Sequence, residues 1–310
     1  MEIAFTKCHG SGNDFALVDA RDAALAGIDW APVAQLICDR AGPVGADGIL
    51  LLVAGDMDHA FGMRVINADG SEPESCLNGL RLVGRAGLDA LGLETAQVKL
   101  KTSTAQVARQ PELAPGVATI QTVAGPASTD PSDIGLHVAA PVIDAVIPGL
   151  PNPRRFTALA IPNPHLITFV DQIDEAELVA LGTWCEARPA LLADRANVSF
   201  CEMRPDGLFV QTFERGVGLT SACGTAMASA THAAGLTDRV PFGREITVHN
   251  PGGRVRVMAA GPDGDDRVTI AGNATFLYDA TIEVGPDQLG PLNITRDRAV
   301  EQAAWILATR

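Results

Sequence analysis

Two stretches of the chain carry the same order of hydrophobic and polar positions. Residues 62–67 and 207–215 alternate as half-buried strands do, and a glycine-containing loop follows each. After each loop, apolar and small residues recur at helical spacing, and the helix begins at a cysteine, Cys76 in the first stretch and Cys223 in the second. The pattern predicts a strand, a loop and a helix in two copies.

The spacing of several residues indicates that these copies belong to a longer repeat. Asn67 precedes Cys76 by nine residues, as Glu214 precedes Cys223, and Cys38 and Cys185 are separated by the same 147 positions as Cys76 and Cys223. A two-copy unit longer than about 100 residues implies two similar domains and not a solenoid. We expect each domain to present one cysteine at a helix start, and the two cysteines to face each other across a cleft.

The remaining chain predicts short strands, few helices and a separate C-terminal segment. Pro, Asp and Gly residues between positions 126 and 153 indicate a crossover between domains. The expected parts are an N-terminal half with Cys76 over residues 1–130, a C-terminal half with Cys223 over residues 150–280, and a helical extension over residues 286–310. An amphipathic stripe in the extension favours packing on its own domain, with a dimer contact as the alternative.

Composition and charge narrow the class of protein. The 310 residues are 47% hydrophobic, enough for two ordinary cores, and the net charge of −14 opposes binding to nucleic acid or to an anionic membrane. We expect a cytoplasmic protein, because no signal peptide and no membrane-spanning apolar run is recognisable. Six cysteines without a CxxC pair favour neither a disulfide scaffold nor a zinc site, so no metal is expected.

Eight motifs, in order over roughly residues 1–280, resemble those of the diaminopimelate epimerases, which are cofactor-independent two-cysteine enzymes. The motifs are His9-Gly-Ser-Gly-Asn-Asp-Phe, Gly45-Ala-Asp-Gly, Asn67-Ala-Asp-Gly-Ser-Glu, Cys76-x-Asn-Gly, Asn163-Pro-His, Ala196-Asn197-Val, Glu214-Arg-Gly and Ala222-Cys-Gly-Thr. The resemblance implies an α/β fold of two pseudo-symmetric domains, each a mostly antiparallel sheet wrapped around a central helix. It also implies an isomerase that interconverts LL- and meso-diaminopimelate for lysine and cell-wall precursor biosynthesis, without a cofactor, and we expect a homodimer.

The two cysteines suit this chemistry on their own terms. Inversion of an α-carbon needs a base on one face and an acid on the other, and a thiol with an ordinary pKa of about 8.5, which a helix N-terminus can lower, serves as either. One thiolate removes the α-proton while the opposite thiol delivers one. Backbone N–H groups at the helix starts, around Leu77–Gly79 and Gly224–Thr225, would stabilise the charge on the α-carboxylate.

Other polar residues would recognise the substrate. Arg215 can clamp a carboxylate bidentately. The resemblance places this arginine with Asn67, Asn163, Asn197 and Glu214 at the distal amino-acid end, and Asn13 and Asn78 at the reacting end, whereas His165 and Glu214 would modulate the thiol pKa values. The predicted substrate-binding set is Asn13, Asn67, Leu77, Asn78, Asn163, Asn197, Glu214, Arg215, Gly224 and Thr225. Taken singly, Asn13, Asn78 and Asn163 are ordinary turn residues. On its own, His165 would be an ordinary loop histidine and Glu214-Arg215 a surface pair.

Four residues depart from the family pattern and leave alternatives open. Leu77, Pro162, Leu219 and Ala226 replace small or acidic residues near the expected site, and Leu77 could narrow the pocket or tilt the amides. A racemase for another amino acid, a dithiol redox protein and a non-catalytic binding relative are the alternatives. We interpret Cys8, Cys38, Cys185 and Cys201 as structural.

Overall fold

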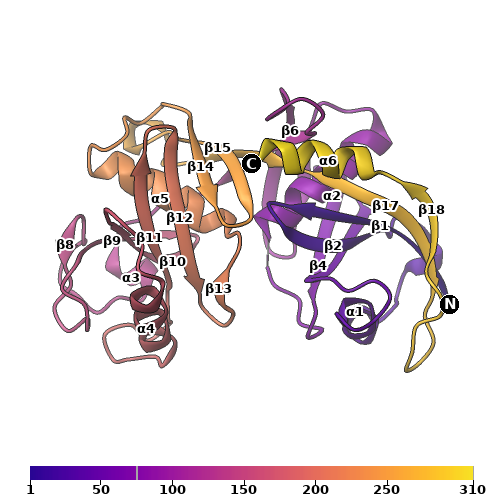
Figure 1. The fold of residues 1–310 in the computed structure, drawn as a ribbon, viewed down its shortest axis with the longest axis horizontal. Coiled ribbons are helices and arrows are strands. Elements are labelled where there is room, and N and C mark those ends of the chain that lie inside the picture. Colours follow the sequence, from indigo (N-terminus) through magenta and orange to yellow (C-terminus); the bar gives the residue numbers. More distant parts are fainter. Residues whose placement is uncertain (75, 310) are drawn as a thin grey trace. The chain divides into compact units, whose positions relative to one another are not determined.

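The computed structural model describes residues 1–74 and 76–309 and divides the chain into two compact units (Figure 1). Unit 1 comprises Met1–Thr122 and Ala271–Arg310, and unit 2 comprises Val123–Ile270. The sequence predicts a boundary near residue 280, whereas the structure returns residues 271–280 and the C-terminal extension to unit 1. The reason is a pairing that local pattern cannot reveal, because β17 (Thr275–Glu283) runs antiparallel beside β1 (Glu2–Gly10).

The other elements of unit 1 are β2 (Asn13–Asp19), the short 3-10 helix η1 (Ala23–Leu25), α1 (Trp30–Cys38), β3 (Gly48–Ala54), β4 (Phe61–Asn67), α2 (Leu77–Leu91), β5 (Thr95–Lys99), β6 (Thr104–Gln110), β18 (Asn293–Asp297) and α6 (Ala299–Ala308). Two strands carry the chain across the boundary between the units, β7 (Thr119–Ala124) and β16 (Val268–Asn273).

Unit 2 contains α3 (Pro131–Ile134), β8 (Ala145–Val146), β9 (Arg155–Ile161), β10 (Asn163–Phe169), α4 (Glu175–Glu186), β11 (Asn197–Arg204), β12 (Gly207–Glu214), β13 (Gly218–Thr220), α5 (Gly224–Leu236), β14 (Ile246–Asn250), β15 (Gly253–Ala259) and η2 (Pro262–Gly264).

Both units pair their strands in the same order, which confirms the predicted fold class. In unit 1 the pairs β1–β2, β2–β3, β3–β4, β4–β5 and β5–β6 alternate antiparallel and parallel. In unit 2 the pairs β9–β10, β10–β11, β11–β12, β12–β14 and β14–β15 alternate in the same way. Helices α1 and α2 occupy the places in unit 1 that α4 and α5 occupy in unit 2.

Strand β3 explains how unit 1 holds a helix at its centre. It is almost wholly apolar because both of its faces are covered: Leu50 packs in the cluster that contains Leu80 of α2, and Leu51 packs in the cluster that contains Trp30 of α1. Complete burial of each leucine contributes about 1.5–3 kcal/mol. The start of α2, where Cys76 lies, is therefore held by a packed core and not by a mobile loop.

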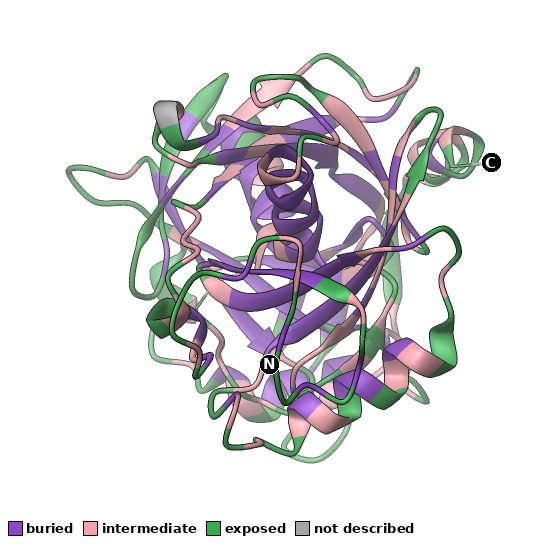
Figure 2. Cartoon of the chain, turned by 90° about the vertical axis from the view of Figure 1, so that its left-hand side faces the viewer, coloured by how far each residue is buried: buried purple, intermediate pink, exposed green. Residues whose placement is uncertain are grey.

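Helix α5 is the corresponding central helix of unit 2, and most of its residues are buried. Figure 2, coloured by burial, shows a buried helix surrounded by strands. Small residues allow this close approach: a Cβ at Gly235 would lie 2.4 Å from the Phe242 ring. The small residues of α5 and its lack of charged residues other than His232 follow, because a helix enclosed by a sheet has no solvent face.

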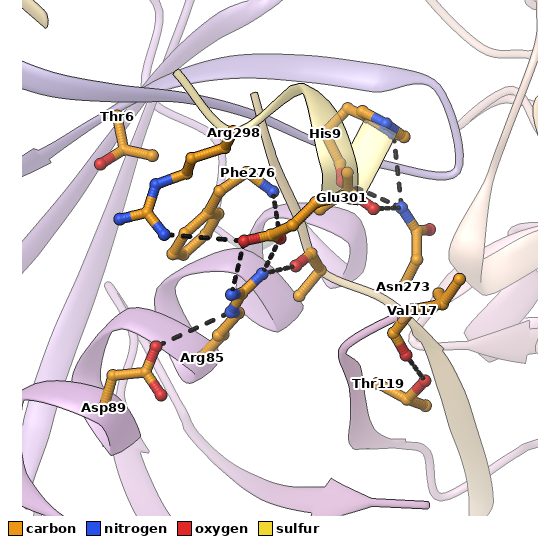
Figure 3. Close-up of polar contacts among 12 residues, drawn as sticks. Thr6, His9, Arg85, Asp89, Val117, Thr119, Asn273, Phe276, Arg298 and Glu301 are labelled. Atoms are coloured by element: carbon orange, nitrogen blue, oxygen red, sulfur yellow. Dashed lines mark hydrogen bonds and ion pairs between the residues drawn. The ribbon is translucent and has the colours of Figure 1, made fainter. Parts of the chain in front are cut away.

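The C-terminal helix α6 packs on unit 1, which also contains the N-terminal half of the chain. Glu301 accepts hydrogen bonds from both terminal nitrogens of Arg85 and from the Phe276 backbone N–H, at 3.2 Å for the last (Figure 3). The buried Trp305 ring lies 5.9 Å from the His9 ring between centroids. None of the helices in the described part of the chain combines the length and apolar character needed to cross a membrane.

We expect the Arg85–Glu301 pair to make stability depend on pH. Burial alone would raise the pKa of Glu301, but the hydrogen bonds and charge of Arg85 outweigh it and the net pKa is lowered. A lowered folded-state pKa means that the contribution is present above the ordinary glutamate pKa of about 4.3 and is lost as pH falls through the folded value. Glu301→Gln should therefore cost about 1.5–3 kcal/mol of unfolding free energy at pH 7 and progressively less on acidification, measured by urea unfolding. An equal cost at every pH would contradict this.

Candidate active site

Cys76 is the N-cap residue of α2. Its backbone is extended, and its Sγ lies 3.4 Å from the backbone N of Gly79, which donates to the sulfur. A Cβ on Gly79 would lie 2.7 Å from Leu50 Cδ2, so a larger residue here would displace the buried Leu50 side chain. A sulfur that accepts an amide hydrogen bond at the positive end of a 15-residue helix is favoured as the thiolate.

Two predicted asparagines lie beside Cys76. Asn13 Oδ1 accepts from the Cys76 thiol at 3.9 Å and from Asn78 Nδ2 at 3.4 Å, while Asn13 Nδ2 donates to Asp47 at 2.7 Å. Leu77 is half-buried and packs against the hydrophobic cluster around α2. The side chain that departs from the family pattern is thus partly absorbed by the core.

Asn67 ends β4, and within the described residues its side chain is hydrogen-bonded to the turn that follows and not to Cys76. Its Nδ2 donates to Ser71 Oγ at 3.0 Å, within the turn that Asp69 and Gly70 form, where Gly70 has φ 87°. The hydrogen bonds of the structure therefore join Asn13, Cys76 and Asn78 and set Asn67 in the adjoining turn.

Cys223 is the N-cap of α5 and has a different electrostatic setting. Its Sγ lies 3.4 Å from Thr225 Oγ1, and its pKa is raised well above the ordinary value by burial and by the charge of Glu214. The pattern at the helix start predicts a lowered pKa here. That expectation is corrected: the α5 amide of Ala226 and the Thr225 hydroxyl do lower the pKa, but burial and the carboxylate outweigh them.

Glu214 is held next to Cys223 by the β12–β13 hairpin. Thr220 Oγ1 donates to its carboxylate at 2.5 Å, and burial raises the pKa of Glu214 in spite of this bond. The charge of Glu214 raises the pKa of Cys223, which is the direction that keeps the proton on that thiol.

His165 lies on β10 directly opposite Asn197 of β11. Its Nε2 is within hydrogen-bond distance of Asn163 Oδ1 (3.2 Å) and Asn197 Nδ2 (3.3 Å), and Asn197 Oδ1 accepts from the Arg215 backbone N at 3.0 Å. Burial, with the nearby charge of Arg215, lowers the pKa of His165 to about 3. In the neutral imidazole, Nε2 either donates to Asn163 Oδ1 or accepts from Asn197 Nδ2, and the ring supplies no positive charge to a thiol.

The Arg215 side chain lines a cavity of about 380 Å³ in unit 2, together with Arg188 and Arg195. Its Nη1 donates to Asp194 O at 3.2 Å, whereas Arg195 is paired with Glu186. Arg188 and Arg195 were missed by sequence reasoning, and both have positive φ, 53° and 60°. Arg195 could have been found, because it directly precedes the Ala196-Asn197 motif.

The other four cysteines have the environment of core residues. All are buried, and burial raises the pKa of Cys38 to about 11, that of Cys185 to about 12, and those of Cys8 and Cys201 further. Of the remaining departures, Pro162 and Leu219 are exposed and Ala226 is buried. Within the described ranges, no group of three His, Cys, Asp or Glu side chains could hold a metal ion.

Solved structures of epimerases and their relatives share this fold. A hydroxyproline epimerase from Agrobacterium vitis matches with a TM-score of 0.60 over 99% of this chain and 98% of its own, at 15% identity. A phenazine biosynthesis protein of the PhzF family from Bacillus anthracis matches with a TM-score of 0.64 over 92% of this chain and 100% of its own, at 14% identity. At these identities the likeness defines the fold class alone.

Sequence comparison defines the family within that class. A family profile described as diaminopimelate epimerase matches residues 5–112 and 157–277. A diaminopimelate epimerase from Listeria welshimeri is 37% identical over 98% of this chain and 94% of its own length, and one from Ligilactobacillus salivarius is 38% identical over 96% of each. The chain therefore belongs to the diaminopimelate epimerase family.

Proposed function

We propose that this protein is an isomerase that interconverts LL- and meso-diaminopimelate without a cofactor, as a step of lysine and cell-wall precursor biosynthesis. One observation carries the proposal. In a chain of this family, the central helix of each of two like units begins at a cysteine, Cys76 on α2 and Cys223 on α5. The repeat also matches Cys38 with Cys185, but these two cysteines lie at the C-terminal ends of α1 and α4 and not at helix starts.

The reaction is a proton transfer at one α-carbon. The thiolate of one cysteine removes the α-proton, the electron pair of the broken C–H bond moves onto the α-carboxylate, and the thiol of the other cysteine delivers its proton to the opposite face. The first cysteine ends as the thiol and the second as the thiolate, so the reverse reaction exchanges their roles. The mechanism requires both sulfurs to reach opposite faces of the same carbon.

The helix starts and the polar residues have separate tasks in this proposal. Backbone N–H groups of Leu77 and Asn78 on α2, and of Gly224 and Thr225 on α5, stabilise the negative charge that develops on the α-carboxylate. Arg215 binds the distal carboxylate. Asn163 and Asn197, held by His165, orient the distal amino group, and Asn13 with Asn67 completes the site on unit 1.

Solvent isotope exchange tests the proposal directly. Incubated with LL-diaminopimelate in deuterated water, the enzyme should incorporate one deuterium at the α-carbon of each meso product formed, detected by mass spectrometry. Fast exchange on another amino acid with none on diaminopimelate would favour the alternative, a racemase for a different substrate. The substrate is a small molecule in either case, and a homodimer and a cytoplasmic location remain predictions.

A further inference from the structure

The largest fully buried side chain outside the proposed machinery is a cation. Arg81 lies one turn into α2 and is 0% exposed. Arginine is almost never completely buried unless a carboxylate accompanies it, because its charge loses the solvation of water. A buried arginine in the central helix of unit 1 therefore needs an explanation.

The groups around Arg81 are neutral. Its Nε donates to Asn273 O at 3.1 Å, and its Nη2 donates to Ser11 Oγ at 3.1 Å and to Asn78 Oδ1 at 3.0 Å. Its Nη1 has no hydrogen-bond partner among the described residues, and none of their carboxylates forms an ion pair with it. The fold makes room for this cation, because a Cβ on Gly10 would lie 3.0 Å from Nη2.

Arg85, one turn further along the same helix, shows the usual arrangement. It is paired with the carboxylate of Glu301 and lies 4.1 Å from the centroid of the Phe276 ring (Figure 3). Helix α2 thus carries two inward arginines, one neutralised by a carboxylate and one without any. The difference indicates that the negative partner of Arg81 is present only in one chemical state of the protein.

Cys76 is the group that can supply that negative charge. The Arg81 guanidinium donates to Asn78, and Asn78 donates to Asn13 Oδ1, which also accepts from the Cys76 thiol at 3.9 Å while that sulfur carries its proton. The Cys76 sulfur acts on the guanidinium electrostatically: burial lowers the pKa of Arg81 to about 10, and Cys76 opposes that shift. Arg81 remains a cation at neutral pH.

We propose that Arg81 is the buried counter-charge of the Cys76 thiolate and thereby makes Cys76 the base of the resting enzyme. On unit 2 the buried carboxylate of Glu214 keeps the proton on Cys223, so the two cysteines are poised as thiolate and thiol before substrate binds. Arg81 is a positioning residue in this account, since it acts through Cys76 and the first turn of α2. The inference rests on the proposed function only in taking Cys76 as the base.

Alkylation of Cys76 measures its thiolate without substrate. The rate of modification by iodoacetamide is followed from pH 5 to pH 10, with each cysteine resolved by peptide mass spectrometry. In the wild-type protein the midpoint for Cys76 should lie below the ordinary cysteine value of about 8.5, and below the midpoint for Cys223. Arg81→Met should raise the Cys76 midpoint by about 1–3 pH units. Arg81→Lys keeps the positive charge and should have a midpoint close to that of the wild-type protein.

A second pair of variants keeps Arg81 in place. Ser11 is fully buried against Nη2 and has φ 53°, a conformation that Asp and Asn tolerate. Ser11→Asp adds a carboxylate that neutralises the guanidinium and should raise the Cys76 midpoint. Ser11→Asn introduces a side chain of nearly the same shape as aspartate but without the charge, and should leave the midpoint unchanged. Arg85→Met removes a cation of the same helix whose charge Glu301 already neutralises, so it should leave the Cys76 midpoint unchanged.

The outcomes separate this inference from the proposed function. A wild-type Cys76 midpoint at or above 8.5, or Arg81→Met and Ser11→Asp variants that leave it unmoved, would overturn the role of Arg81. If Arg81→Met does not fold, the Ser11→Asp and Ser11→Asn variants test the role of Arg81 instead. The Cys76 midpoint of the wild-type protein can be measured in any case. If the alkylation midpoints shift as expected for the role of Arg81 but the enzyme does not exchange the α-proton of diaminopimelate, the proposed function alone is refuted. In active protein, Arg81→Met should lower kcat more than it changes KM and should move the acid limb of the rate profile to higher pH.

Discussion

Epimerisation should fall by about 10²–10⁴-fold or more in Cys76→Ser and in Cys223→Ser, because each substitution removes one of the two groups that transfer the proton. A serine hydroxyl is far less acidic than a thiol and is a poor base and acid near neutral pH. The remaining thiol should still work on its own face. Each variant should therefore exchange the α-proton of only one stereoisomer with solvent deuterium, without inversion, and the two variants should differ in which stereoisomer that is.

The buried cysteines provide matched controls for this result. Cys38 and Cys185 occupy equivalent positions in the two units, and the pKa of each is raised by burial. Cys38→Ser and Cys185→Ser should retain kcat per folded molecule and change only stability. Exchange on both stereoisomers by either site variant, or loss of kcat in either control, would contradict the assignment of Cys76 and Cys223 as base and acid.

The repeat was readable from the sequence because its signals are local. A strand, a loop and a helix that begins at a cysteine follow one another within each half, and the pairing order of the strands agrees with two copies of one unit. The return of the C-terminal strand was not readable in that way. Glu2 pairs with Glu283 across nearly the whole chain, and alternation within β17 says nothing about which strand lies beside it.

The electrostatic differences between the two cysteines also lay beyond the sequence. Both are helix N-caps, so a local argument gives them the same pKa direction. Burial and Glu214 decide the direction at Cys223, and Glu214 is brought there by the β12–β13 hairpin. Nothing in the sequence indicated the role of Arg81 either, because an arginine within a helix is ordinarily expected to face solvent. Strands enclose α2, so this position faces the interior.

Specificity should depend on Arg215. Its guanidinium lines the cavity of unit 2, and its backbone N–H binds the Asn197 side chain that His165 holds. A site built to pair a second carboxylate rejects a substrate that lacks it, because its buried polar groups are then left without partners. The expected discrimination is about 10⁴–10⁵-fold in kcat/KM, so lysine should be a very poor substrate beside diaminopimelate.

Arg215→Met should abolish most of this preference by lowering kcat/KM for diaminopimelate far more than for lysine. Deuterium exchange into both amino acids, measured side by side, gives the ratio. Arg204, which is paired with Glu202 outside the cavity, provides the control, and Arg204→Met should keep the wild-type ratio. Turnover of lysine by the wild-type enzyme at a rate close to that of diaminopimelate would refute the clamp. Specificity would then have to arise at the reacting end, where Leu77 replaces the glycine of the family pattern.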